Sequence, residues 1–105
     1  MKKYRILFSE RAVTDFTEIT DYLSMEIKMP STSEKFAHQL LKTIASLSFS
    51  AEIYPVIEYK IPLLSHKESL HRINFKNWAI IYTILGDVVG IERIIHGSLI
   101  KKTFN

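Results

Sequence analysis

The feature that most constrains the fold is an almost wholly apolar run, residues 79–85, which lies between two short turn sequences. Gly86-Asp87 suits a two-residue hairpin turn. In the preceding pair, Lys76-Asn77, Asn77 can adopt a positive φ. An apolar strand of this kind is typical of the centre of a sheet that is covered on both faces. We therefore predict an antiparallel meander with strands over residues 70–75, 78–85 and 88–95.

Two amphipathic helices are predicted before this meander. Ser9 is placed to cap the first helix, with Glu10 in its first turn. Pro30 disfavours helical geometry at Met29 and so ends this helix. Its apolar residues at helical spacing are Ala12, Val13, Phe16, Ile19, Leu23 and Ile27.

The second helix follows almost at once. Ser31 and Glu34 match a capping box, with serine at the N-cap and glutamate three residues later. Because so few residues join the two helices, we expect them to form an antiparallel hairpin. The apolar stripe of the second helix, which should face the core, comprises Phe36, Ala37, Leu40, Leu41, Ile44 and Leu47.

These elements define an α+β fold in a single domain spanning residues 1–105. Tyr4, Ile6 and Phe8 alternate along an N-terminal strand over residues 3–8. The helix hairpin comes next, and a three- to four-stranded antiparallel sheet packs on it. The fourth strand would be a short edge strand at 56–61, between Pro55 and Pro62, because proline is tolerated at sheet edges.

The two-residue turns also fix which strand residues share a face. Pairing Leu85 with Val88 places Ile81 opposite Glu92, and pairing Phe75 with Trp78 places Arg72 opposite Ile81. One face therefore carries Leu70, Arg72, Asn74, Thr83, Gly90, Glu92 and His96. The other face, which should meet the helices, carries Ile73, Phe75, Trp78, Ile80, Tyr82, Ile84, Val89, Ile91 and Ile95. Arg93 falls on this packed face, where its charge must reach the edge or find a partner.

Composition narrows the class of protein. Fourteen lysines and arginines against 11 acidic residues give a net charge of +3, which suits nucleic acid or an acidic protein as partner. The chain has no cysteine, and its histidines lack metal-ligand spacing, so we expect neither a metal nor a cofactor. No phosphate-binding loop, HExxH motif or G-x-S-x-G elbow is present. Without a long apolar run, we expect a cytoplasmic protein with no membrane contact.

His96 and Arg72 are the residues on the polar face best suited to chemistry. Histidine titrates near neutral pH and can act as acid or base, although a strand-end histidine can equally bond to the backbone. Arginine presents a fixed fork of donors to carboxylates or phosphates. Beside Glu92, however, Arg72 can also form an ordinary cross-strand ion pair.

Taken together, these segments resemble the ParE/RelE family of toxins from two-gene toxin–antitoxin systems. Residues 9–16 and 19–23 look like the first helix of that family. Leu70-His71-Arg72-Ile73, Ala79-Ile80-Ile81-Tyr82 and residues 91–97 are similar to its strand block. The resemblance implies the same fold and a co-encoded antitoxin. We expect that antitoxin to lay an amphipathic segment over apolar residues such as Ile81, Leu85 and Ile94.

Two activities are implied by the resemblance. ParE-like members poison DNA gyrase, whereas RelE-like members cleave mRNA in the ribosome, often with a C-terminal tyrosine. Ile95-His96-Gly97 looks ParE-like, and Phe104 lacks the hydroxyl of that tyrosine. Leu99-Ile100, however, replaces the basic and acidic residues that many ParE relatives carry there. We therefore expect a gyrase poison, with a ribosome-dependent mRNA endoribonuclease or an inactive relative that binds only antitoxin as alternatives.

The expected site lies on the polar face under either activity. For a gyrase poison, the expected target-binding residues are Arg72, Asn74, Lys76, Glu92, Arg93 and His96. For a nuclease, His96 or Arg72 would assist attack of the ribose 2′-hydroxyl, since that reaction needs a base and nearby cations.

Overall fold

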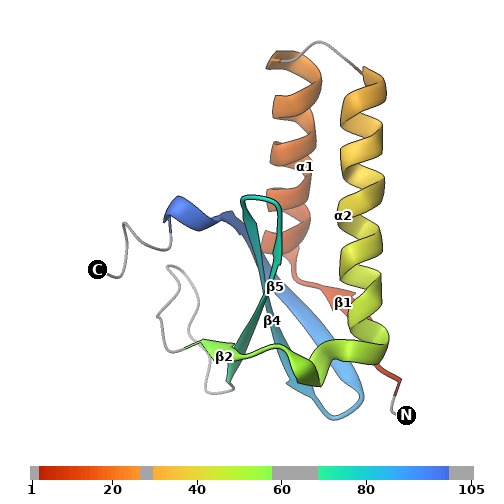
Figure 1. Cartoon of the computed structure of the whole chain (residues 1–105), viewed down its shortest axis with the longest axis vertical. Coiled ribbons are helices and arrows are strands. Elements are labelled where there is room, and N and C mark those ends of the chain that lie inside the picture. Colours follow the sequence, from red (N-terminus) through yellow and green to blue (C-terminus); the bar gives the residue numbers. More distant parts are fainter. Residues whose placement is uncertain (1–2, 27–29, 58–68, 100–105) are drawn as a thin grey trace.

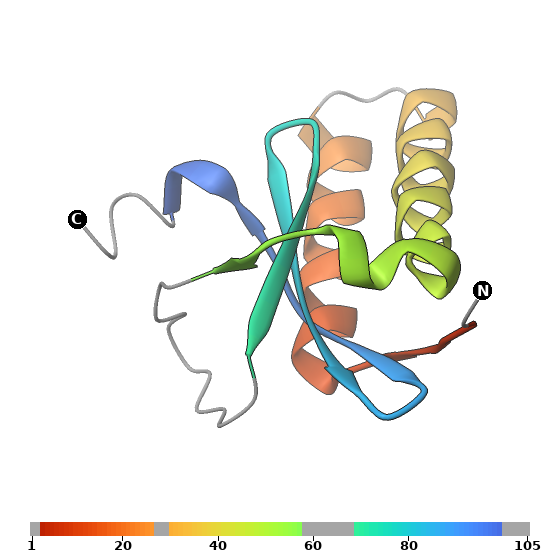
Figure 2. The ribbon, with the colours of Figure 1, turned by 60° about the horizontal axis from the view of Figure 1, so that its bottom comes forward.

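The computed structural model describes residues 3–26, 30–57 and 69–99. Two helices lie side by side on one face of a five-stranded sheet with strand order β1-β5-β4-β3-β2 (Figures 1 and 2). This arrangement confirms the predicted α+β fold. Ile27, residues 58–61 of the predicted edge strand, and residues 100–105 lie outside the described residues. In chain order the elements are β1 Arg5–Phe8, α1 Glu10–Glu26, α2 Pro30–Ser50, the 3-10 helix η1 Ala51–Ile53, β2 Val56–Ile57, β3 Leu70–Phe75, β4 Trp78–Leu85 and β5 Val88–His96.

The N-terminal strand β1 joins the far edge of the sheet. It runs parallel to β5, and Phe8 pairs with Ile91. Ser9 then turns the chain into α1: its hydroxyl donates to the Glu92 carbonyl at 2.9 Å and accepts from the Ala12 amide at 3.0 Å. The predicted N-cap at Ser9 is thus confirmed, and the same side chain ties the start of α1 to β5.

The start of α2 differs from the prediction. The helix begins at Pro30, which suits a first helical position because proline has no N–H to leave unpaired. Ser31 therefore lies inside the helix, and the predicted capping box is wrong. Ser33 joins the two helices instead, since its hydroxyl donates to the Thr20 carbonyl at 3.1 Å. Within the predicted apolar stripes, Val13 and Leu41 are exposed.

The main core lies between the helices and one face of the sheet. The Tyr82 side chain is fully buried there, and its hydroxyl donates to the Ala51 carbonyl at 2.6 Å. Of the residues expected between hairpin and sheet, Leu40, Ile80 and Tyr82 are buried, and Phe16 is partly buried. The fully buried side chains of this core include Leu40, Ile44, Leu47, Ile80, Tyr82, Val89, Ile91 and Ile94.

A β-bulge in β5 breaks the predicted register. Phe75 pairs with Trp78, Arg72 with Ile81, and Leu85 with Val88, as predicted. Tyr82 then pairs with Ile91, but Ile81 pairs with Arg93, so Glu92 is an extra residue in β5. The predicted pairing of Ile81 with Glu92 is therefore wrong.

An extra residue exchanges the two faces of the strand beyond it. Ile94 consequently packs in the helix-side core, whereas Ile95 packs with Ala79 and Ile81 on the opposite face. Both assignments are the reverse of the prediction. Ile81 and Ile94 are buried, so of the apolar residues expected to await an antitoxin on the outer face only Leu85 is exposed, at 64%.

Both hairpin turns close with two residues, and in each the first residue has positive φ: Lys76 at 54° and Gly86 at 62°. In the first turn the positive φ therefore falls on Lys76, whereas the prediction placed it on Asn77. Neither helix of the described chain is long and apolar enough to span a bilayer.

Candidate functional site

Because of the bulge, the residues predicted to form one polar face lie in two groups on opposite faces of the sheet. Cross-strand partners share a face, so Arg72 and its partner Ile81 lie on the side away from the helices. His96 pairs with Trp78, which packs against the helix-side core. The expectation that Arg72 and His96 share one surface is therefore wrong, because a single inserted residue reverses the end of β5.

The first group lies along β3. The Arg72 guanidinium Nε donates to the Asn74 side-chain oxygen at 2.8 Å, which fixes the two side chains together. Lys76 follows in the exposed turn, with its ammonium 5.8 Å from the centre of the Phe75 ring. Gly97 approaches from the end of β5, and its amide donates to the Asn77 carbonyl at 2.8 Å.

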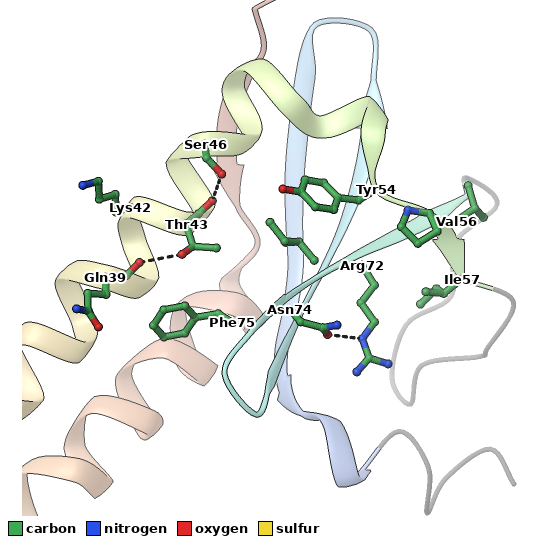
Figure 3. Close-up of a pocket in the computed structure, with 12 residues that line it drawn as sticks. Gln39, Lys42, Thr43, Ser46, Tyr54, Val56, Ile57, Arg72, Asn74 and Phe75 are labelled. Carbon is green, nitrogen blue, oxygen red and sulfur yellow. Dashed lines mark hydrogen bonds between the residues drawn. The ribbon is translucent and has the colours of Figure 1, made fainter.

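Residues 72–75 of β3 form one wall of an open groove of about 1280 Å³ (Figure 3). The opposite wall is α2, and Tyr54 to Ile57 close one end. Sequence reasoning missed this groove because its walls come from segments far apart in the chain. Its lining residues are Gln39, Lys42, Thr43, Ser46, Tyr54, Pro55, Val56, Ile57, Arg72, Ile73, Asn74 and Phe75.

Glu92, the extra residue of the bulge, is held by its neighbours on the sheet. One of its carboxylate oxygens accepts a hydrogen bond from the Thr83 hydroxyl at 3.1 Å. Gly90 leaves room for this contact: a Cβ there would lie 3.0 Å from the Thr83 hydroxyl oxygen and 3.1 Å from the Glu92 carboxylate. The Glu92 side chain is therefore placed by the bulge and by Thr83.

Arg93 is buried, with 8% of the residue exposed, and it meets Asp15 of α1. Its Nε donates to Asp15 Oδ2 at 2.8 Å and its Nη2 donates to Oδ1 at 3.2 Å. The Ile94 amide also donates to Oδ2, at 2.9 Å. The charge of Arg93, which was predicted to need a partner or to reach the edge of the sheet, is thus paired with Asp15. The sequence contains an indication of this ion pair, because Asp15 lies three residues after Ala12 and next to Phe16, on the side of α1 that faces the core.

His96 lies in a second cleft, between α1 and the end of β5, together with Asp15, Tyr22 and Trp78. Its ring meets the Trp78 indole edge-on, with centroids 5.2 Å apart. Nδ1 accepts from the Ser98 amide at 3.3 Å and lies 2.7 Å from the Ser98 hydroxyl oxygen. The two contacts with Ser98 therefore orient the ring. The bond from the Ser98 amide is the backbone hydrogen bond that was the alternative expected for a histidine at a strand end.

The arrangement limits the chemistry that these groups can perform together. Across residues 3–26, 30–57 and 69–99, no cluster of three or more histidine, aspartate or glutamate side chains could hold a metal ion. The Arg72 guanidinium and the His96 imidazole project from opposite faces of the sheet, so they do not converge on one substrate atom. Both groups instead border surfaces that a partner protein could contact.

Comparison with known proteins agrees with the fold. The family model for the ParE toxin of the type II toxin–antitoxin system parDE matches residues 6–100. A solved structure of the chromosomal ParDE toxin–antitoxin system from P. aeruginosa superposes with a TM-score of 0.71 at 14% identity, covering 90% of this chain and 96% of that chain. The search of curated proteins found no match. Because the family match spans nearly the whole sequence, this chain belongs to the ParE toxin family of type II toxin–antitoxin systems.

Proposed function

We propose that this toxin inhibits growth by poisoning DNA gyrase and that a cognate antitoxin neutralises it. The proposal rests on membership of the ParE family and on one structural observation. Because of the bulge at Glu92, His96 lies on the face of the sheet opposite to Arg72. A metal-free ribonuclease needs a general base and cations around the same phosphate. This separation favours a toxin that acts by binding over one that cleaves RNA.

We further propose that the expected target-binding residues divide by role. Arg72, Asn74, Lys76 and His96 are at least partly exposed and can touch a target. Arg93 is buried against Asp15, and Glu92 bonds to Thr83, so these two hold the shape of β5. Since gyrase acts on chromosomal DNA, the proposal places the toxin in the cytoplasm.

A side-by-side assay of the two cellular targets tests the activity. After induction, plasmid supercoiling and mRNA integrity are followed in the same culture, and purified toxin is added to gyrase with supercoiled DNA. We expect gyrase-dependent DNA breaks or loss of supercoiling, with intact mRNA. Prompt mRNA cleavage with unchanged supercoiling would instead support the ribonuclease.

Neutralisation is tested with the neighbouring gene. Co-expression of the toxin with the co-encoded protein should restore growth and yield a complex that purifies as one species. Two proteins that purify apart, with growth still arrested, would contradict this part of the proposal.

A further inference from the structure

The strand β1 lies at the edge of the sheet opposite β2, and its outer side is open (Figure 2). It pairs with β5, and no second described strand lies beside it. Its side chains are accessible as well: Leu7 is 55% exposed and Phe8 is 37% exposed, although both are apolar. An open edge with exposed apolar side chains is a surface on which another strand can pair.

The main-chain groups that face outward from β1 are those of Ile6 and Phe8. The amides of Arg5 and Ser9 donate to main-chain carbonyls in the hairpin of β5, at 2.8 and 2.9 Å. Consecutive residues of a strand direct their N–H and C=O groups to opposite sides. The main chain of Leu7 therefore also faces β5, whereas the N–H and C=O groups of Ile6 and Phe8 point away from the sheet.

This open stretch is short because other elements occupy both of its ends. On the N-terminal side, the Tyr4 amide already donates to the Ser48 carbonyl at the end of α2, at 2.8 Å. On the C-terminal side, the chain leaves the sheet and α1 begins at Glu10. An added strand can therefore bond only to Ile6 and Phe8, so a long segment of a different protein gains nothing from its further residues.

A second copy of β1 fits this stretch in one antiparallel register. When Ile6 pairs with Phe8 of the second copy, Phe8 pairs with Ile6 of that copy, and the outward main-chain groups of both strands are all satisfied. A register centred on Ile6 would instead need the Tyr4 amide, which is already bonded. A register centred on Phe8 would need a residue of α1. The strand is thus its own complement about a two-fold axis at Leu7.

Apolar side chains match in the same register. Ile6 packs with the helix-side core, and Phe8 shares that face because it pairs with Ile91 of the core. Ile6 of one copy then lies beside Phe8 of the other. On the opposite face the two Leu7 side chains meet at the axis as a non-bonded pair, the kind in which side chains approach most closely.

The charges at the ends of the paired strands are complementary. Arg5, which is exposed, falls opposite Ser9 of the second copy, and Ser9 directly precedes the exposed Glu10. The two-fold axis brings these opposite charges together at both ends of the contact. A second copy therefore matches β1 in hydrogen bonds, in apolar side chains and in charge.

We propose that this chain forms a two-fold symmetric dimer in which the β1 strands of two copies pair antiparallel, with Leu7 at the axis. The two sheets then continue as one. Because the contact is short, its dissociation constant should be on the order of 0.1 mM. Arg72, Asn74 and Lys76 lie on and just after β3, away from this edge, so the dimer leaves them free and its loss should not change toxicity. The inference does not depend on the cellular target.

The position of the axis gives a sharp test with the full chain. Sedimentation velocity over a range of protein concentrations measures self-association. Leu7→Glu and Leu7→Lys each place like charges opposite one another, so each should weaken the dimer by roughly tenfold or more. An equimolar mixture of the two variants should associate again, because glutamate then faces lysine.

Amide hydrogen exchange tests the strand pairing itself. At about 1 mM protein, a dissociation constant near 0.1 mM leaves roughly a fifth of the chain as monomer. Exchange at the amides of Ile6 and Phe8 should then be roughly fivefold slower than in dilute protein. Exchange at Leu7 should not depend on concentration, since its amide already bonds to β5.

Further variants locate the contact and verify its charges. Arg5→Glu should weaken the dimer severalfold, and Arg5→Glu combined with Glu10→Lys should recover part of the loss. Met25→Glu is the matched control for Leu7→Glu, because Met25 is an apolar residue with 70% exposure near the far end of α1. It should leave association unchanged. Amide spectra that otherwise match the unmodified protein establish that each variant is folded.

Several results would overturn the proposal. A chain that stays monomeric up to about 1 mM forms no such dimer. Association that survives Leu7→Glu, or that Met25→Glu abolishes equally, places the contact on another surface. A mixture of the two Leu7 variants that does not associate, or a dimer in which Ile6 and Phe8 exchange as fast as in the monomer, excludes antiparallel pairing about Leu7.

Discussion

Asp15 on α1 and Arg93 on β5 form a buried, two-pronged ion pair that fastens the first helix to the last strand. The same Asp15 carboxylate also accepts a hydrogen bond from the Ile94 amide. This amide lies just beyond the bulge, where β1 has already ended at the pairing of Phe8 with Ile91. Asp15 thus accepts a hydrogen bond from a backbone amide at a strand edge that no described strand covers. It also balances the charge of Arg93, which is buried away from water.

Removing Asp15 should therefore destabilise the fold strongly. We expect Asp15→Ala to lower the free energy of unfolding by about 3–5 kcal/mol, since it removes the carboxylate that forms a two-pronged ion pair with the buried Arg93 charge. Urea titration followed by circular dichroism measures the change. Arg11 is the control: it lies 3.8 Å from the same carboxylate and is half exposed, so Arg11→Ala should cost less than about 1 kcal/mol. Equal effects of the two substitutions would contradict this account.

The hydrogen bond from Tyr4 to Glu52 should make stability depend on alkaline pH. This bond, and then burial and the negative charge of Glu52, raise the pKa of Tyr4 from 10.0 to about 12. The folded state thus holds the tyrosine proton more tightly than the unfolded state does. The resulting stability is fully present below pH 10 and is lost as the pH rises through 12.

Absorbance titration of the phenolates, compared between the unmodified protein and Tyr4→Phe, isolates this group among the five tyrosines. In Glu52→Gln, which lacks the negative charge, the pKa of Tyr4 should fall toward 10.0. An unchanged Tyr4 titration in that variant would exclude Glu52 as the cause.

Gly90 should be needed for its small size. A methyl group there would lie within about 3 Å of the Thr83 hydroxyl and the Glu92 carboxylate. We expect Gly90→Ala to cost roughly 1–3 kcal/mol, as overpacking usually does. Adding Thr83→Ala should recover part of that loss, so the two substitutions would be non-additive in a double-mutant cycle. Strict additivity would mean that Thr83 is not the obstruction.

Much of this fold is predictable from local signals. The turn residues place both C-terminal hairpins, and the bounds of β3 and β4 follow directly. Ser9 marks the start of α1 because its hydroxyl can cap a helix wherever the helix packs. These features are encoded by residues close together in the chain.

The bulge is not predictable in this way, because the register argument assumes an uninterrupted ladder from Gly86-Asp87 onward. One clue was present: the unbroken register put charged Arg93 on the packed face. An extra residue at Glu92 and the partner Asp15 resolve that conflict. The groove beside β3 was missed for a different reason, since only the packed fold places residues of α2 and of β3 on the lining of one groove.

The final prediction concerns toxicity and separates the two polar groups. If the toxin binds gyrase, Arg72→Ala should weaken binding and growth arrest, because the guanidinium is partly exposed and fixed by Asn74. His96→Ala should have the smaller effect, since that ring is turned toward Trp78 and Ser98. A ribonuclease that used His96 as its acid or base would instead lose cleavage by roughly 10²–10⁴-fold in His96→Ala.

Growth after induction of each variant measures the outcome, with circular dichroism as the check on folding. Arg5→Ala is the matched control, because it removes an exposed arginine from the opposite edge of the sheet. It should leave toxicity unchanged. Full toxicity in a folded Arg72→Ala, His96→Ala double variant would place the target-binding surface elsewhere. The exposed apolar side chains of Tyr22 and Met25 on α1 would then be the next to replace, since at 63% and 70% exposure they can be changed without disturbing the core.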